Sequence, residues 1–306
     1  MNKLILLLFL SFSLLAKTNQ TKLSTKLEKK FDKSEVIENP TLQTLSGSLN
    51  RFSLYSSFTY RGGSLSDPLG AERPNILNAK EQPSLSNMSG NLGLKYRMTK
   101  TDNLSFQVGV YSVTPFHSSH TASSARIQRE YDQNGQDVNF DDPTISYFKT
   151  YYLGKIQNIS FVRFQYTTRD IYRQFGLRGI LNYSHAAAFK LTKFAYIAAS
   201  LNYDRLFYDQ ESTMFRGREV SLLPNQIENR LRGNLTAEMY LSRKISFRFI
   251  TDIFSLTQLR RSSDIEDRDL QQTIAMTYFI NRDISIAPNI RFVTKDIRSD
   301  RTNIGL

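Results

Sequence analysis

Residues 91–110 read NLGLKYRMTKTDNLSFQVGV, and this stretch decides the fold class of the chain. Large apolar side chains occupy every second position on both sides of a polar turn at residues 99–103: Leu92, Leu94, Tyr96 and Met98 before it, and Leu104, Phe106, Val108 and Val110 after it. Because successive side chains on a strand point to opposite faces, the pattern predicts a β-hairpin with one apolar and one polar face. Each arm is about ten residues long, the length that a tilted strand needs to cross a bilayer.

The same alternation recurs along most of the chain and predicts twelve strands. The first begins after Leu49 and places Phe52, Leu54, Phe58 and Tyr60 on one face. Beyond the hairpin, the remaining strands are expected near residues 144–153, 160–167, 175–184, 195–203, 231–241, 245–253, 274–278, 284–292 and 302–306. Leu94, Phe106, Leu235 and Phe247 are expected on the outer, apolar face, with Arg97, Gln107, Arg232 and Arg248 on the inner face.

The links between these strands alternate in length. Short links join the strands in pairs, as at residues 242–244 and 281–282, whereas the longest links span 61–88, 113–142, 204–229 and 255–271. Short turns at one end and long loops at the other are typical of bacterial outer-membrane β-barrels. An even number of strands also allows the sheet to close without an exposed edge.

The N-terminal residues have the layout of an export signal. Lys3 precedes an apolar run that ends at Ala16, so residues 1–16 are predicted to be a cleaved signal peptide. Residues 17–47 form a charged segment, expected in the periplasm, in which Leu23, Leu27 and Phe31 suggest a short amphipathic helix and disorder is the alternative. Residues 48–306 are then the barrel domain.

Composition limits the remaining possibilities. The chain contains no Cys, so it has neither a disulfide nor a thiolate metal site, and no cofactor is expected. The net charge is +12, and removing Lys3 with the signal peptide leaves an excess of eleven positive charges. Such an excess of positive charge favours binding of anionic ligands or lipid headgroups. Nucleic acid is not expected as a partner, because the chain is exported.

Over nearly the whole mature chain, the repeated pattern resembles the class of bacterial outer-membrane β-barrels, all-β and closed. The resemblance implies residence in the outer membrane of a Gram-negative bacterium. It also implies contact with outer-membrane lipids, lipopolysaccharide and the barrel-assembly machinery. Three features depart from the usual pattern: the chain ends in Leu306 rather than an aromatic residue, it contains no Trp, and Pro288 interrupts a predicted strand. Pro288 removes one backbone donor, so a bulge or poorly paired stretch is expected there.

The polar face of the predicted strands carries an excess of basic residues. The inward positions include Lys95, Arg97, Arg163, Arg178, Arg232, Arg248 and Arg291, opposed by Glu238 and Asp252. Arg and Lys rings attract anions in anion-preferring pores. The alternative is an Arg–carboxylate network that fills a narrow barrel and leaves no path.

Other polar residues carry weaker signals. His117 and His120 are expected at the outer rim, where either residue could act as the base of a lipid hydrolase. Oxygen-bearing side chains crowd residues 132–142, but the spacing of a calcium loop is absent, so a plain surface loop is expected. His185 is expected in a short link, without a partner. No metal site or catalytic residue is assigned.

The sequence therefore predicts an outer-membrane channel, resembling a porin, for the transport of small and anionic solutes. Two alternatives remain open: an outer-membrane lipid hydrolase acting at the outer rim, and a non-conducting barrel with adhesive surface loops.

Overall fold

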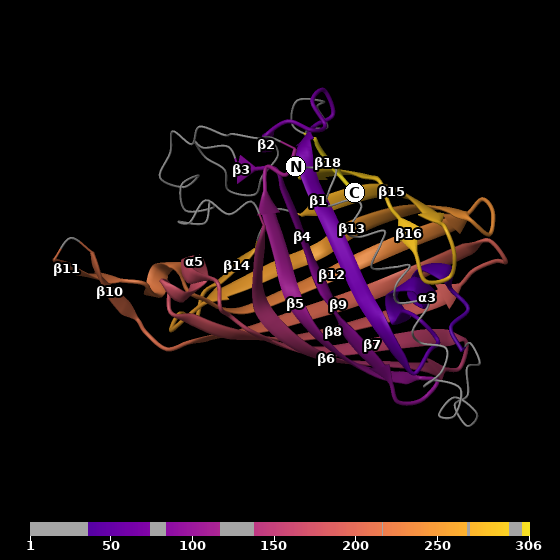
Figure 1. The fold of residues 1–306 in the computed structure, drawn as a ribbon, viewed down its shortest axis with the longest axis horizontal. Helices are drawn as coiled ribbons and strands as arrows, with labels where there is room; N and C mark the ends of the chain where they lie inside the picture. The colour runs from indigo at the N-terminus through magenta and orange to yellow at the C-terminus, as the bar shows by residue number, and fades with distance from the viewer. Residues whose placement is uncertain (1–35, 74–83, 117–137, 216, 268–269, 294–301) are drawn as a thin grey trace.

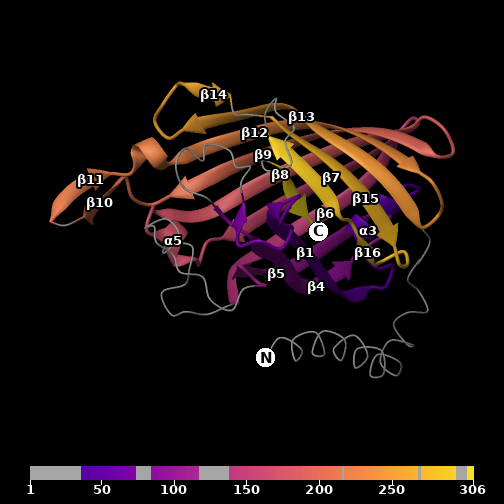
Figure 2. The ribbon, with the colours of Figure 1, turned by 90° about the horizontal axis from the view of Figure 1, so that it is seen from above.

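The computed structural model describes residues 36–73, 84–116, 138–215, 217–267, 270–293 and 302–306. In this part of the chain, twelve antiparallel strands form the wall of a closed β-barrel (Figures 1 and 2). The predicted fold class and strand number are confirmed. The predicted signal peptide and the predicted helix at Leu23, Leu27 and Phe31 lie outside the described residues.

The wall strands follow one another around the barrel in chain order. They are β1 (Phe52–Ser64), β4 (Asn87–Arg97), β5 (Asp102–Val113), β6 (Asn139–Leu153), β7 (Ile156–Tyr166), β8 (Leu177–Lys190), β9 (Ala195–Tyr208), β12 (Ile227–Tyr240), β13 (Ile245–Leu259), β15 (Gln271–Phe279), β17 (Asn289–Val293) and β18 (Asn303–Gly305). The shorter elements are helices α3 (Pro40–Ser46) and α5 (Asp170–Arg173), a 3-10 turn η2 (Leu223–Asn225), and strands β2 (Glu72–Arg73), β3 (Ser84–Leu85), β10 (Ser212–Phe215), β11 (Arg218–Ser221), β14 (Ile265–Asp267) and β16 (Ser285–Ile286).

The last strand closes the barrel on the first. Gly305 of β18 pairs with Arg61 of β1, and Asn303 pairs with Ser64. Beyond the end of β18, Leu306 exchanges two backbone hydrogen bonds with Tyr60. The seam between the first and last strands is therefore much shorter than the contact between β1 and its other neighbour β4, which runs from Phe52 to Arg61.

Pro288 interrupts the wall where the sequence predicts a defect. Strand pairing stops after Ile286 at the end of β16 and resumes at Asn289 at the start of β17. The carbonyl of Pro288 still accepts a hydrogen bond from Met276 N. The ring therefore removes a donor without displacing the segment from its neighbour.

The two ends of the barrel differ in the length of their links. At the short-turn end, the links span residues 98–101, 154–155, 191–194, 241–244 and 280–284. At the long-loop end lie the α5 segment and the β10–β11 hairpin, which projects beyond the wall (Figure 1). The strands run further into this end than predicted. The prediction of a surface loop over residues 132–142 is wrong for its last four residues, because β6 already begins at Asn139.

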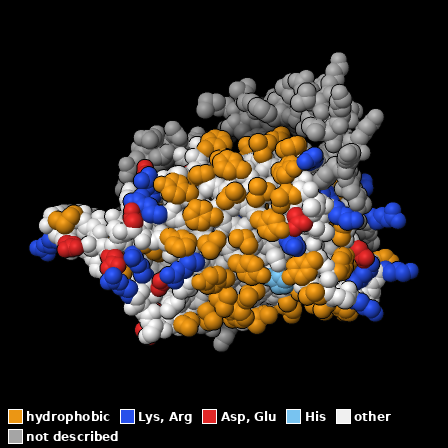
Figure 3. All heavy atoms as spheres, turned by 90° about the horizontal axis from the view of Figure 1, so that it is seen from below, with side chains coloured by type: hydrophobic (Ala, Val, Ile, Leu, Met, Phe, Trp, Pro, Cys, Tyr) orange, Lys and Arg blue, Asp and Glu red, His pale blue; other side chains and the backbone are white. Residues whose placement is uncertain are grey.

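The two faces of the wall are chemically distinct. Apolar side chains cover the middle of the outer surface, whereas charged groups gather mostly towards its two ends (Figure 3). Leu94, Phe106, Leu235 and Phe247 are all exposed on the apolar side, as predicted, whereas Gln107 is 3% exposed. The period-two pattern therefore separates an apolar exterior from a polar interior.

Neighbouring positions on β12 test this separation. Leu235 is 41% exposed on the outer surface, whereas Thr236 faces the interior and lines a cavity. In lipid vesicles, Leu235→Arg should lower the free energy of unfolding by about 2–4 kcal/mol, because an arginine near the bilayer midplane loses its hydration. Thr236→Arg should cost far less. Urea titrations of the two variants measure the difference, and equal losses would contradict the assignment of the faces.

Candidate functional site

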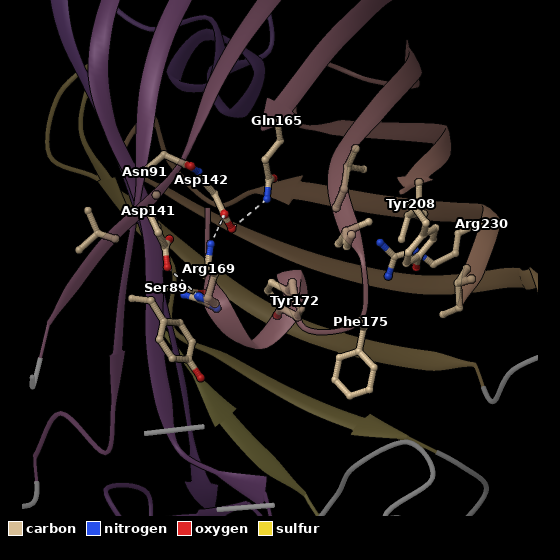
Figure 4. A pocket seen from close by; sticks show the side chains of 18 of the residues that line it. Ser89, Asn91, Asp141, Asp142, Gln165, Arg169, Tyr172, Phe175, Tyr208 and Arg230 are labelled. Atoms are coloured by element: carbon tan, nitrogen blue, oxygen red, sulfur yellow. Dashed lines mark hydrogen bonds and ion pairs between the residues drawn. The ribbon is translucent and has the colours of Figure 1, made fainter. Parts of the chain in front are cut away.

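The interior of the barrel contains two cavities. The outer vestibule, of about 470 Å³, lies towards the long-loop end and is bounded by residues of the β6–α5–β8 region (Figure 4). The inner chamber, of about 570 Å³, continues towards the short-turn end. Gln165, Ile180 and Arg230 line both cavities. These three residues therefore mark the boundary between two successive compartments of the lumen.

Helix α3 forms because its ends are capped. The side chain of Asn39 accepts a hydrogen bond from Leu42 N at 3.0 Å, and Pro40 fits the first helical position because it has no N–H to satisfy. At the other end, Gly47 has a φ of 70° and donates its N–H to the last carbonyls. A side chain at Gly47 would also collide with the Lys95 ammonium group.

One side of this helix is tied to β12. Asn39 Nδ2 and Thr41 Oγ1 donate to the two oxygens of Glu238, at 3.2 Å and 2.6 Å. Tyr240 OH donates to Asn39 Oδ1 at 3.1 Å, and Ser246 adds a further bond to Glu238 at 2.9 Å. Glu238 is buried, and its carboxylate is satisfied by the N-terminal segment and its own neighbours.

The other side is tied to β4 and to the last short turn. Lys95 Nζ donates to the carbonyls of Ser46 at 2.6 Å and Ser48 at 2.9 Å. Arg282 Nη1 donates to Gly47 O at 2.5 Å. We call residues 36–48 the plug, because these contacts hold it across the short-turn end, where Asn39, Thr41, Leu42 and Leu45 form part of the floor of the inner chamber.

The predicted lumen residues thus have different positions. Lys95 and Glu238 hold the plug. Arg97 is buried and donates to the carbonyls of Thr99 and Lys100 in its own short turn, at 3.2 Å and 2.9 Å. Arg97 therefore lies at the edge of the barrel, fixed by peptide groups rather than facing a solute path.

Arg178 corrects the expected phase of β8. Pairing of β8 with β9 shifts between Leu177 and Gly179, so one extra residue enters the strand there. Leu177 consequently lines the outer vestibule, and Arg178 forms a half-exposed ion pair with Asp209 at the rim. The prediction that Arg178 lines the lumen is wrong, because a bulge reverses the alternation at that point.

Three of the predicted arginines lack a bound counter-charge. Within the described residues, Arg163, Arg232 and Arg291 form no ion pair and no side-chain hydrogen bond, and Arg163 lines the inner chamber. Arg291 lies within electrostatic range of Arg61, Arg232 and Asp252. Among the described residues, these three guanidinium groups therefore have no bonded carboxylate.

The two remaining predicted residues are partly neutralised. Arg248 lies 3.9 Å from Glu238, at the limit of an ion pair. Asp252 accepts hydrogen bonds from Asn234 Nδ2 and, at 3.2 Å, from Gln271 N. Asp252 acts electrostatically on Arg291, but its oxygens already bind an amide side chain and a backbone N–H.

A loop folds over the outer vestibule and is fixed by Asp142. This residue has a φ of 50°, a conformation that aspartate tolerates better than most residues. Its carboxylate accepts hydrogen bonds from Thr168 N at 2.8 Å, Arg169 N at 3.3 Å and Gln165 Nε2 at 3.1 Å (Figure 4). The segment that leads into α5 is therefore held against the inside of β6.

Arg169 completes this attachment. Its Nε forms an ion pair with Asp141 at 2.6 Å, and its guanidinium lies 4.0 Å from the centre of the Tyr111 ring. Burial on its own would lower the pKa of Arg169, but the adjoining Asp141 carboxylate raises it above the usual value. The guanidinium therefore stays charged at any physiological pH.

The sequence did not reveal the residues that form the plug and the loop attachment. Asn39-Pro40 is a recognisable start of a helix, and this signal could have located α3. No comparable signal identifies Asp142 and Arg169, because their pairing depends on a strand irregularity between Gln107 and Gly109 in the β5–β6 ladder.

The hydrolase alternative depends on two histidines that the structure does not describe. His117 and His120 lie outside the described residues. His185 lies in β8 rather than in a link, which corrects its expected position, and its Nδ1 is 3.0 Å from Ser160 Oγ. Among the described residues no carboxylate contacts this pair, and none of their His, Asp and Glu side chains cluster in a way that could hold a metal ion. The positions of Ser160 and His185 alternate with lumen residues, which places the pair on the outer surface.

No protein-family model and no curated protein matches the sequence. Solved structures with the same fold include the COG4313 outer membrane channel from Pseudomonas putida F1, with a TM-score of 0.52 and 8% identity over 85% of this chain and 95% of that chain. OmpF of Salmonella typhi also matches, with a TM-score of 0.37 and 8% identity over 83% and 96% of the two chains. At this identity, the first comparison supports the outer-membrane barrel fold, and the second adds nothing to it.

Removing the Asp142 carboxylate should release the α5 segment without opening the wall. Asp142→Ala leaves the N–H groups of Thr168 and Arg169 without their acceptor, which costs about 1–3 kcal/mol. Cleavage by trypsin after Arg169 and Arg173 in folded protein should accelerate by roughly tenfold or more. Asp142→Asn, which keeps one carbonyl acceptor, should show a smaller change. Asp264→Ala, in another long loop, is the control, and equal cleavage of all variants would contradict the attachment.

Proposed function

We propose that the protein is an outer-membrane channel for small anionic solutes, closed at its periplasmic end by the plug. The observation that carries the proposal is that three inward arginines, Arg163, Arg232 and Arg291, have no ion pair among the described residues, and that Arg163 lines the inner chamber, whose floor is formed by the plug. Charges within a low-dielectric wall act more strongly than exposed ones and are screened less by salt. Such a lumen attracts anions and repels cations.

The proposal also assigns a direction. In barrels of this kind, short turns face the periplasm and long loops face outward. A solute from outside would enter the outer vestibule, pass Gln165, Ile180 and Arg230, and reach the inner chamber above the plug. Passage into the periplasm then requires the plug to move. The hydrogen bonds at Glu238 and Lys95 would hold the closed state.

Selectivity should depend on the unpaired arginines. The triple variant Arg163→Gln, Arg232→Gln and Arg291→Gln should shift the reversal potential in a salt gradient towards cations, because it removes three uncompensated charges from the lumen. The control is Arg178→Gln, which removes a positive charge from the rim. Planar-bilayer recordings measure both. Unmodified protein that already prefers cations, or folded protein that never conducts, would contradict the proposal.

Opening should depend on the hydrogen bonds between the plug and β12. The double variant Asn39→Ala and Thr41→Val removes the two donors that the plug supplies to Glu238, and bonds to a charged acceptor contribute about 1.5–3 kcal/mol. The ratio of open to closed channels should rise roughly tenfold to a hundredfold in single-channel recordings. The matched control is Glu38→Gln, also in the plug, which breaks an exposed ion pair with Lys190 of β8 and should change little.

Deleting residues 17–45 gives a second measurement. The deleted protein should still assemble, because the described part of the segment, residues 36–45, contributes no strand to the wall. It should conduct steadily, without closures. Failure to assemble would show that the segment is needed for folding, and unchanged gating would show that the plug does not close the channel.

A further inference from the structure

The outer vestibule has an apolar wall on the inner faces of strands β8, β9 and β12. Leu177 and Ile180 of β8 pair across the ladder with Tyr208 and Leu206 of β9, and Ile227 of β12 extends the same surface. Phe175, just before β8, covers its end. Leu177 and Leu206 are nearly fully buried. Apolar residues on the inner face of a barrel strand are unusual, because the lumen of such barrels is polar.

The opposite wall is polar, but its acidic groups are already bound. Figure 4 shows Ser89, Asn91, Asp141 and Asp142 on one side of the vestibule, with Tyr208 and Arg230 on the other. Asp141 is paired with Arg169, and Asp142 binds backbone N–H groups and Gln165. The charge of Asp141 is neutralised by Arg169, and both oxygens of Asp142 are already occupied by hydrogen-bond donors.

Two arginines facing the vestibule retain capacity to bind an anion. Among the described residues, Arg61 donates to the neutral Ser89 hydroxyl at 2.9 Å and forms no ion pair. Arg230 Nη2 lies 3.2 Å from Asp204, but the Arg230 side chain is still 40% exposed. An entering carboxylate would therefore find donors on Arg61 and Arg230 beside the apolar wall.

We propose that the outer vestibule binds amphipathic monoanions, with the carboxylate held by Arg61 and Arg230 and an aromatic or branched hydrocarbon body against Leu177, Ile180, Leu206 and Ile227. This inference rests on the proposed function and specifies its substrate class. The volume of about 470 Å³ lies within the range of pockets that enclose small organic ligands. Small hydrophilic anions would gain nothing from the apolar wall.

Binding of 2-naphthoate to the purified full-length protein tests the proposal. The chain has no Trp, so naphthoate fluorescence can be followed without interference from indole, against a blank of empty detergent micelles. Naphthoate should bind at least about tenfold more tightly than acetate, which competes through the charge alone. It should also bind at least about tenfold more tightly than 2-naphthalenemethanol, which has the same body without the charge.

Variants locate the site. Ile180→Thr with Ile227→Thr keeps β-branched side chains in both strands but removes apolar surface, and should weaken naphthoate binding about tenfold while leaving acetate unchanged. Arg230→Gln should weaken both acids. Met214→Thr, in the exposed β10–β11 hairpin, and Arg178→Gln, at the rim, are matched controls and should have no effect.

The outcomes separate this inference from the proposed function. Equal affinity for naphthoate and acetate, or naphthoate binding that the Thr variants leave intact, would overturn the vestibule assignment even if bilayer recordings show an anion channel. Tight, variant-sensitive naphthoate binding by a protein that never conducts would support the vestibule assignment and overturn the channel.

Discussion

A strand inside a bilayer has no water to satisfy its backbone, so the whole molecule depends on a continuous, closed ladder of hydrogen bonds between strands. That constraint explains the even strand number and the strict alternation of side chains. The ladder is short at its seam, where the three residues of β18 join β1. Next to the seam, Pro288 removes a donor, yet its carbonyl keeps the segment attached to β15.

The charges inside the barrel serve two different purposes according to their depth. Near the short turns, Lys95, Arg97 and Glu238 bind peptide groups or side chains of neighbouring segments. A buried charge needs such partners, because its desolvation would otherwise cost several kcal/mol. Further along the lumen, Arg163 lines the inner chamber and has no ion pair among the described residues. The plug thus rests on charges that could otherwise have contributed to the field in the lumen.

Two local irregularities shape the vestibule. The bulge beside Arg178 turns Leu177 inward and sends the arginine to the rim. The shift near Asp142 lets that residue reach the backbone of the α5 segment. Each irregularity moves one residue out of the alternating pattern. On β8 the result is an apolar lining in place of the expected polar one, and on β6 it is a loop fixed across the strand. Bulges of this kind are common next to functional sites.

The sequence by itself determined the barrel. Period-two alternation, link lengths and the even strand number follow from local geometry and from the exclusion of water, so the sequence predicts them without a tertiary structure. The outward positions of Leu94, Phe106 and Leu235 are examples. The interruption of strand pairing at Pro288 could also be predicted from the sequence, because the missing N–H is a property of the residue itself.

Which inward charges stay free was decided by the tertiary structure. Lys95, Arg163 and Arg178 look alike in the alternating pattern, yet one holds the plug, one faces a cavity and one lies at the rim. The docking of α3 brings Ser46 to Lys95, and a single bulge brings Arg178 to Asp209. Arg163 has no such partner among the described residues. Contacts between segments far apart in the sequence leave no period in it, and an extra residue in a strand reverses the face without changing composition.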